Sequence, residues 1–65
     1  MISKNIRELR LQNKLTQPQL AEKIGVKRST ISAWEHDNGT PSPEMLSKLK
    51  DALNCSYEEL IDGKL

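Results

Sequence analysis

Residues 17–36 read Gln-Pro-Gln-Leu-Ala-Glu-Lys-Ile-Gly-Val-Lys-Arg-Ser-Thr-Ile-Ser-Ala-Trp-Glu-His. Apolar side chains recur in this stretch at helical spacing, first as far as Ile24 and again from Ile31 to Trp34. Gly25 separates the two runs, and glycine readily adopts the left-handed conformation that ends many helices. The stretch therefore predicts two short helices joined by a tight turn.

The packing of these two helices predicts a helix-turn-helix over about residues 16–36. Two helices that cross closely need a small side chain at the crossing point, and Ala21 supplies one. Five apolar residues are expected to fill the angle between the helices: Leu20, Ile24, Val26, Ile31 and Trp34. In such a unit the second helix protrudes and can enter the major groove of DNA.

The rest of the chain predicts an all-α fold, a single domain of five short helices over residues 1–65. Hydroxyl side chains mark the expected helix starts: Ser3, Thr16 with Gln19, Ser42 before Pro43, and Ser56 with Glu59. The first helix should end near residues 13–14 and the second at Gly25. The third should run from about Lys27 to about His36, and the fifth should end at about Asp62. Asn54 should end the fourth helix, and residues 37–41 are the strongest loop signal. Leu60 and Ile61 are expected to face inward.

Composition excludes several classes of function. The chain has one cysteine, Cys55, and one histidine, His36, too few for a metal site of nitrogen and sulfur ligands. No His–carboxylate–nucleophile set and no glycine-rich phosphate loop are present, so we expect neither an enzyme nor a cofactor. No apolar run could span a membrane, and the polar N-terminus lacks a signal segment, which indicates the cytoplasm. At 65 residues, we expect no small-molecule ligand.

The net charge of +1 conceals a gradient along the chain. Residues 1–36 hold seven Lys and Arg against three Glu, a net charge of +4. Residues 37–65 hold three Lys against six acidic residues, a net charge of −3. The expected helix-turn-helix lies in the positive part, which favours a nucleic-acid partner.

The whole chain resembles the phage-repressor type of helix-turn-helix domain, a five-helix bundle related to lambda-type repressors. The likeness covers roughly residues 2–62 and depends on four groups of residues. They are Ile6-Arg7-Glu8-Leu9-Arg10; Leu15-Thr16-Gln17 with Leu20-Ala21 and Ile24-Gly25-Val26; Ser29-Thr30-Ile31-Ser32 with Trp34-Glu35; and Pro41-Ser42, Leu46, Leu49, Ala52-Leu53, Ser56 and Glu59-Leu60. The resemblance implies sequence-specific binding of double-stranded DNA by a homodimer, usually to repress transcription.

Roles on the third helix follow from its faces. Because Ile31 and Trp34 should point inward, an outward set is left to contact base edges: Arg28, Ser29, Ser32 and Ala33. Arg28 is the strongest candidate, because its guanidinium fork matches O6 and N7 of guanine. Three further residues are expected to contact phosphates: Gln17 at a helix start, Lys27 at the rim and Lys14. The resemblance implies the phosphate role of Gln17 as well.

The resemblance also implies an ion pair between Arg10 and Glu35, with a structural role rather than one in DNA readout. The loop over residues 36–40 contains no Lys or Arg, so we expect modest, salt-sensitive affinity that depends on pairing two subunits. His36 is expected as a surface residue.

The sequence leaves two interpretations for the residues of the expected dimer contact. Tyr57 and Ile61 are either core residues or part of a two-fold contact near the last two helices, and Cys55 lies beside them.

An alternative function stays open. The chain could be a protein-interaction module, such as an antitoxin-like or antagonist partner, that keeps the helix-turn-helix fold. Such a module should present apolar residues at positions 28, 29, 32 and 33, and Arg, Ser, Ser and Ala favour DNA.

Overall fold

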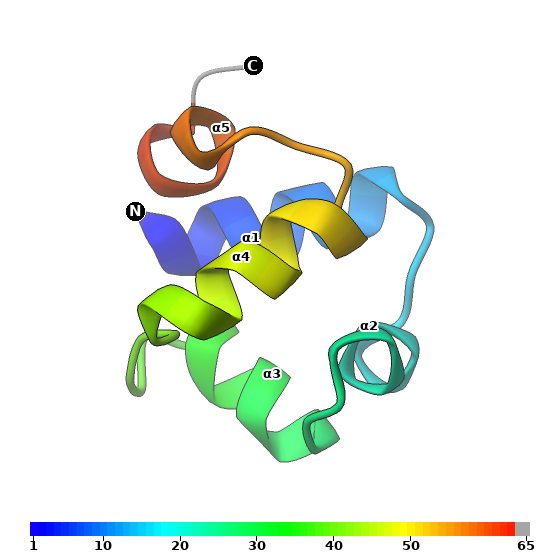
Figure 1. Ribbon diagram of the computed structural model, residues 1–65. Helices are drawn as coiled ribbons and strands as arrows, with labels where there is room; N and C mark the ends of the chain where they lie inside the picture. Colours follow the sequence, from blue (N-terminus) through cyan, green and yellow to red (C-terminus); the bar gives the residue numbers. More distant parts are fainter. Residues whose placement is uncertain (64–65) are drawn as a thin grey trace.

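The computed structural model describes residues 1–63 and contains five α-helices and, within those residues, no strand. They are α1 (Ile2–Gln12), α2 (Gln17–Ile24), α3 (Arg28–Glu35), α4 (Pro43–Ala52) and α5 (Tyr57–Asp62). In Figure 1, α1 and α4 cross the middle of the molecule, with α5 on one side and the α2–α3 pair on the other. The predicted all-α, five-helix fold is confirmed.

The local signals at helix ends act as predicted. The Thr16 Oγ1 accepts a hydrogen bond from the Gln19 amide at 3.2 Å, and the Gln19 Oε1 accepts one from the Thr16 amide at 2.8 Å. Ser56 and Glu59 form the same reciprocal pair at the start of α5. Gly25 ends α2 with a φ of 74°. Each device satisfies backbone groups that a helix end leaves without partners.

Two expectations about helices are wrong in detail. Ser3 does not cap α1: the helix begins one residue earlier, at Ile2, and Ser3 is buried on the same face as Ile6 because the two are three residues apart. The expected bounds of the third helix hold to within one residue, since Lys27 and His36 directly flank α3. Ile61 is 47% exposed, because Leu60 takes the core position on the short α5.

One apolar core joins all five helices. Among the described residues 1–63, ten hydrophobic residues are buried: Ile6, Leu9, Leu20, Ala21, Ile24, Ile31, Trp34, Leu49, Leu53 and Leu60. Val26 packs against this cluster from the turn between α2 and α3. The predicted filling of the angle between α2 and α3 is therefore confirmed, and it holds the outer face of α3 in a fixed orientation.

Two asparagines that the sequence does not single out, one within α1 and one directly after it, tie this helix to the last two. The Asn5 Nδ2 donates to the carbonyls of Leu60 at 3.0 Å and Ile61 at 3.3 Å, in the last turn of α5. The Asn13 Nδ2 donates to the Leu53 carbonyl at 2.9 Å, at the end of α4. Carbonyls at the C-terminal end of a helix have no hydrogen-bond donor within the helix, and the side-chain amides of Asn5 and Asn13 supply one.

Replacing Asn5 by alanine should lower the free energy of unfolding by about 1–3 kcal/mol, because the buried Leu60 carbonyl loses its donor. Urea unfolding followed by circular dichroism measures this. The same substitution at the exposed Gln12 of α1 is the control and should change stability by less than about 0.5 kcal/mol. Equal effects for the two variants would show that the Asn5 amide contributes nothing to the docking of α5.

Candidate nucleic-acid interface

The surface that could meet DNA is formed by α2, the turn after it and α3. The Val26 amide donates to the Ala21 carbonyl at 3.0 Å across the Gly25 turn. Only three residues, 25–27, separate the end of α2 from the start of α3. Figure 1 shows α3 at the edge of the molecule far from α5, with α2 beside it. A helix held at such an edge by a second helix has the geometry that can place it in a DNA groove.

The first turn of α3 is its most accessible part. Arg28 and Ser29 are exposed, whereas Ser32 and Ala33, one turn later, are half-buried. Ile31 and Trp34 are buried, as predicted. The four candidate base-contact residues therefore share the outer side of α3, and accessibility decreases from its N-terminal end to its C-terminal end.

The three candidate phosphate contacts lie in different settings. Lys27 is exposed at the N-terminal end of α3, and Lys14 is exposed in the turn between α1 and α2, with a φ of 57°. Gln17 is half-buried in the first turn of α2. Within residues 1–63, the ammonium groups of Lys14 and Lys27 form no hydrogen bond or ion pair, so both are available to an outside anion.

Arg10 and Glu35 form the expected ion pair, in a bidentate arrangement. The Nε of Arg10 donates to Oε2 of Glu35 at 2.7 Å, and its Nη2 donates to Oε1 at 3.1 Å. The Nη1 of Arg10 donates to the Leu15 carbonyl at 2.8 Å. The two side chains are 10% and 2% exposed. The pair braces α1 against α3 and against the segment that leads into α2.

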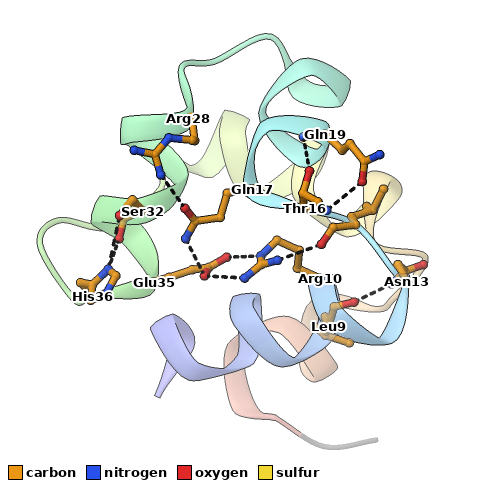
Figure 2. A network of polar contacts seen from close by, with 11 residues as sticks. Leu9, Arg10, Asn13, Thr16, Gln17, Gln19, Arg28, Ser32, Glu35 and His36 are labelled. Atoms are coloured by element: carbon orange, nitrogen blue, oxygen red, sulfur yellow. Dashed lines mark hydrogen bonds and ion pairs between the residues drawn. The ribbon is translucent and has the colours of Figure 1, made fainter.

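Hydrogen bonds connect the ion pair to two candidate DNA-contact residues, Gln17 and Arg28 (Figure 2). The expected role of the pair was purely structural and did not include this connection. The Nε2 of Gln17 donates to Oε1 of Glu35 at 3.1 Å. The Nη1 of Arg28 donates to Oε1 of Gln17 at 3.1 Å. Gln17, a candidate phosphate contact, thus links Arg28, a candidate base contact, to the ion pair of Arg10 and Glu35. Side chains from α1, α2 and α3 make up this chain, which no single segment of sequence reveals.

Two further residues lie beside this network. A polar hollow opens where α1, α2 and α3 meet, and it is lined by Arg7, Arg10, Gln17, Glu35 and His36. His36 is exposed, as expected, and its Nδ1 lies 2.7 Å from the Ser32 carbonyl. Arg7 was not among the residues expected at the site, although its position one turn before Arg10 places both on one side of α1.

The candidate dimer residues lie at the other end of the molecule, on and before α5. Tyr57 is 44% exposed and, with Ile61 one turn later, forms an apolar surface on α5. The Nζ of Lys50 lies 5.5 Å from the centroid of the Tyr57 ring. Cys55 is partly buried, and this burial, followed by the charge of Glu59, raises the pKa of its thiol. At neutral pH the thiol is therefore protonated and packs as a small apolar group.

Other kinds of site find no support among residues 1–63. Their His, Cys, Asp and Glu side chains form no group of three or more that could hold a metal ion. None of the helices in the described part of the chain is long and apolar enough to cross a membrane.

The chain belongs to the helix-turn-helix family, whose family model matches residues 6–60. It is similar to the HTH-type transcriptional activator BcrR of Enterococcus faecalis, at 36% identity over 62 residues, which are 95% of this chain and 30% of that protein. It is also similar to the antitoxin PezA of Streptococcus pneumoniae, at 33% identity over 61 residues, 94% of this chain and 39% of that protein. The chain thus spans less than half the length of these curated relatives.

Among solved structures, the chain is similar to the c2 repressor of Salmonella phage P22 in complex with a synthetic operator. The TM-score is 0.91 at 34% identity, and the match covers 98% of this chain and 97% of the repressor chain in that structure. This match over almost the whole of both chains confirms the predicted lambda-repressor-like fold.

Proposed function

We propose that this chain is a sequence-specific, double-stranded DNA-binding unit that regulates transcription, as a homodimeric repressor on a palindromic operator. The observation that carries the proposal is the exposed first turn of α3, which presents Arg28 and Ser29 and in which the Arg28 guanidinium donates to Gln17 at the start of α2. The operator complex of the similar P22 repressor supports the same assignment. We infer no enzymatic activity and a place of action in the cytoplasm.

In the proposed complex α3 lies in the major groove, and each outward side chain has a distinct task. The guanidinium of Arg28 would donate two hydrogen bonds to O6 and N7 of one guanine. The hydroxyls of Ser29 and Ser32 would donate or accept and so discriminate less between bases. The Ala33 methyl would contact a thymine methyl. Lys27, Lys14 and the Gln17 amide would contact phosphates and fix the position of α3 along the duplex.

A protein-interaction module is the second candidate, and the similarity to the antitoxin PezA is the observation in its favour. The outward residues of α3 argue against a partner protein on that helix, because three of the four are polar or charged. The apolar surface of Tyr57 and Ile61 is the more suitable protein contact. Contact with DNA and contact with a protein partner would therefore lie at opposite ends of the molecule, so variants of α3 and of α5 test them separately.

Selection of bound duplexes from a random pool tests the proposed function most directly. We expect a palindromic consensus with half-sites about 34 Å apart, one turn of the duplex, because a two-fold dimer presents two α3 helices. A consensus without symmetry would contradict the homodimer, and the absence of any enriched sequence would contradict specific DNA binding.

Replacing Arg28 by alanine should weaken binding to the selected duplex by about 1–3 kcal/mol per half-site and relax the preference at one base position. Fluorescence anisotropy with duplexes that vary at that position measures both effects. Lys48→Ala is the matched control, since it removes a positive charge from an exposed position on α4 that is not among the proposed DNA contacts. If Arg28→Ala instead lowers affinity equally for every base, Arg28 contacts a phosphate.

Replacing Ile61 by lysine should raise the dimer Kd by about 30-fold, because a charge would be placed in the proposed apolar contact. Sedimentation at micromolar concentration measures the dimer, and circular dichroism verifies the fold. Leu11→Lys on α1 is the control, because Leu11 is exposed to a similar extent, 52% against 47% for Ile61. A dimer that tolerates Ile61→Lys but not Leu11→Lys would move the interface to α1.

A further inference from the structure

The polar hollow where α1, α2 and α3 meet carries more positive charge than its internal contacts use. Arg10 and Glu35 neutralise each other in their bidentate ion pair. Arg7, the other arginine of the hollow, forms no hydrogen bond or ion pair within residues 1–63. With two arginines against one glutamate, the hollow has a net charge of +1 when His36 is neutral and +2 when its ring is protonated.

His36 is the member of the hollow whose charge depends on pH. Its Nδ1–H donates to the Ser32 carbonyl oxygen at 2.7 Å, because a carbonyl oxygen can only accept. Figure 2 shows the ring beside Ser32 at the end of α3. The Nε2 is therefore the nitrogen that gains the second proton, and it has no hydrogen-bond partner within residues 1–63. Protonation turns this nitrogen from an acceptor into a charged donor.

Charges of both signs act on the His36 ring in the free protein. Arg7 of α1 opposes protonation, and Arg10 offsets most of the effect of Glu35. The exposed Asp37 next to His36 and the C-terminal end of α3 favour protonation. From α2 the hollow receives no charged side chain. An anion that enters the hollow would shift this balance towards the protonated ring.

The anion that fits this hollow at the proposed interface is a phosphodiester of DNA. The hollow lies at the start of α2, where Gln17 is a proposed phosphate contact and also one of the lining residues. The non-bridging oxygens of a phosphodiester can accept from the Arg7 guanidinium and from the protonated His36 ring together. Phosphate contact and protonation of the ring then stabilise each other, because binding that favours one protonation state must itself depend on pH.

We propose that this hollow is a phosphate site whose strength is set by the protonation of His36, so that DNA binding takes up protons. The inference rests on the proposed DNA-binding function and goes beyond it by making the affinity depend on pH. The bound phosphate favours the protonated ring, so the affinity is high at low pH. It is lost as the pH rises through about 5 to 8, the range in which histidine titrates.

Two substitutions of the same residue test the proposal. His36→Gln keeps a neutral side chain at every pH, and His36→Arg keeps a positive charge at every pH. Anisotropy titrations with the selected duplex at about pH 5.5 and about pH 8 measure the affinity. Circular dichroism at both pH values verifies the fold. Burial raises the pKa of the Cys55 thiol, so this group stays protonated at both pH values and does not contribute.

The unsubstituted protein should bind about tenfold more tightly per half-site at the lower pH, the effect of one hydrogen bond to a charged group. His36→Gln should bind weakly at both pH values, and His36→Arg tightly at both. The salt slope of the unsubstituted protein should be steeper by about 1 per protomer at the lower pH, because one more phosphate is neutralised. Calorimetry in two buffers of different ionisation enthalpy should detect proton uptake that is absent in both variants.

Arg7→Gln tests the place of the phosphate. It should reduce the salt slope by about 1 per protomer at both pH values. An unchanged slope in this variant would overturn the assignment of the phosphate to the hollow.

The outcomes separate this inference from the function on which it rests. Equal affinity of the unsubstituted protein at the two pH values would overturn the proton linkage, while the DNA-binding function stands. A pH dependence that persists in His36→Gln would overturn it too, because the proton would be taken up by another group. If no duplex is bound at either pH, the DNA-binding function fails and the phosphate site fails with it.

Discussion

Replacing Arg10 by methionine is expected to lower the free energy of unfolding by about 3–5 kcal/mol, because it leaves the Glu35 carboxylate buried without its cation. The Glu35 side chain is 2% exposed, and its carboxylate accepts two hydrogen bonds from Arg10. A domain of this size has a total stability of only about 3–10 kcal/mol. The variant should therefore be partly unfolded at room temperature.

Urea unfolding followed by Trp34 fluorescence suits this measurement, since Trp34 is buried in the core next to Glu35. Arg7→Met is the matched control, because it makes the same substitution one turn earlier on α1 at an exposed site. The double variant Arg10→Met/Glu35→Leu should recover most of the loss, since replacing a buried ion pair by apolar residues is often neutral. A loss for Arg10→Met no larger than for Arg7→Met would contradict the bracing role of the pair.

The affinity for a palindromic duplex is expected to fall about 10⁴-fold between about 50 and about 200 mM salt. With about four phosphate contacts per half-site, a dimer should show a slope on the order of −7 in a plot of log affinity against log salt concentration. Three of these contacts are proposed at Lys14, at Lys27 and at the start of α2 at Gln17, in the part of the chain with a net charge of +4. Anisotropy titrations at several salt concentrations measure the slope.

Two charge variants make the salt measurement specific to the proposed surface. Lys27→Gln should reduce the slope by about 1 per protomer and weaken binding about equally on every sequence. Lys48→Gln removes the same charge from α4 and should leave the slope unchanged. A slope near zero for the unsubstituted protein would exclude phosphate contacts as the source of affinity and would favour a protein partner.

Local signals in the sequence predicted the elements of this fold. The Thr16–Gln19 and Ser56–Glu59 capping boxes, Ser42 and Gly25 each act within a few residues, so neighbouring sequence is sufficient to recognise them. The positions of Ile31 and Trp34 also predicted the outward face of α3, since helical spacing alone separates the two faces. At Ser3 the rule for helix caps failed: Ser3 is a plausible cap residue, but it lies within α1 on the buried face of the helix.

Only the tertiary structure determined how the polar side chains meet. Asn5 finds its acceptors 55 and 56 residues away, and Gln17 meets Glu35 and Arg28 from a different helix. Such contacts depend on crossing angles between helices, which the apolar pattern of a single helix does not encode. For the same reason Ile61 could not be placed: spacing assigned it to the core, but the packing of α5 left room there for Leu60 alone. The sequence by itself thus determined the helices and their faces, and the packing between helices determined which polar groups act together.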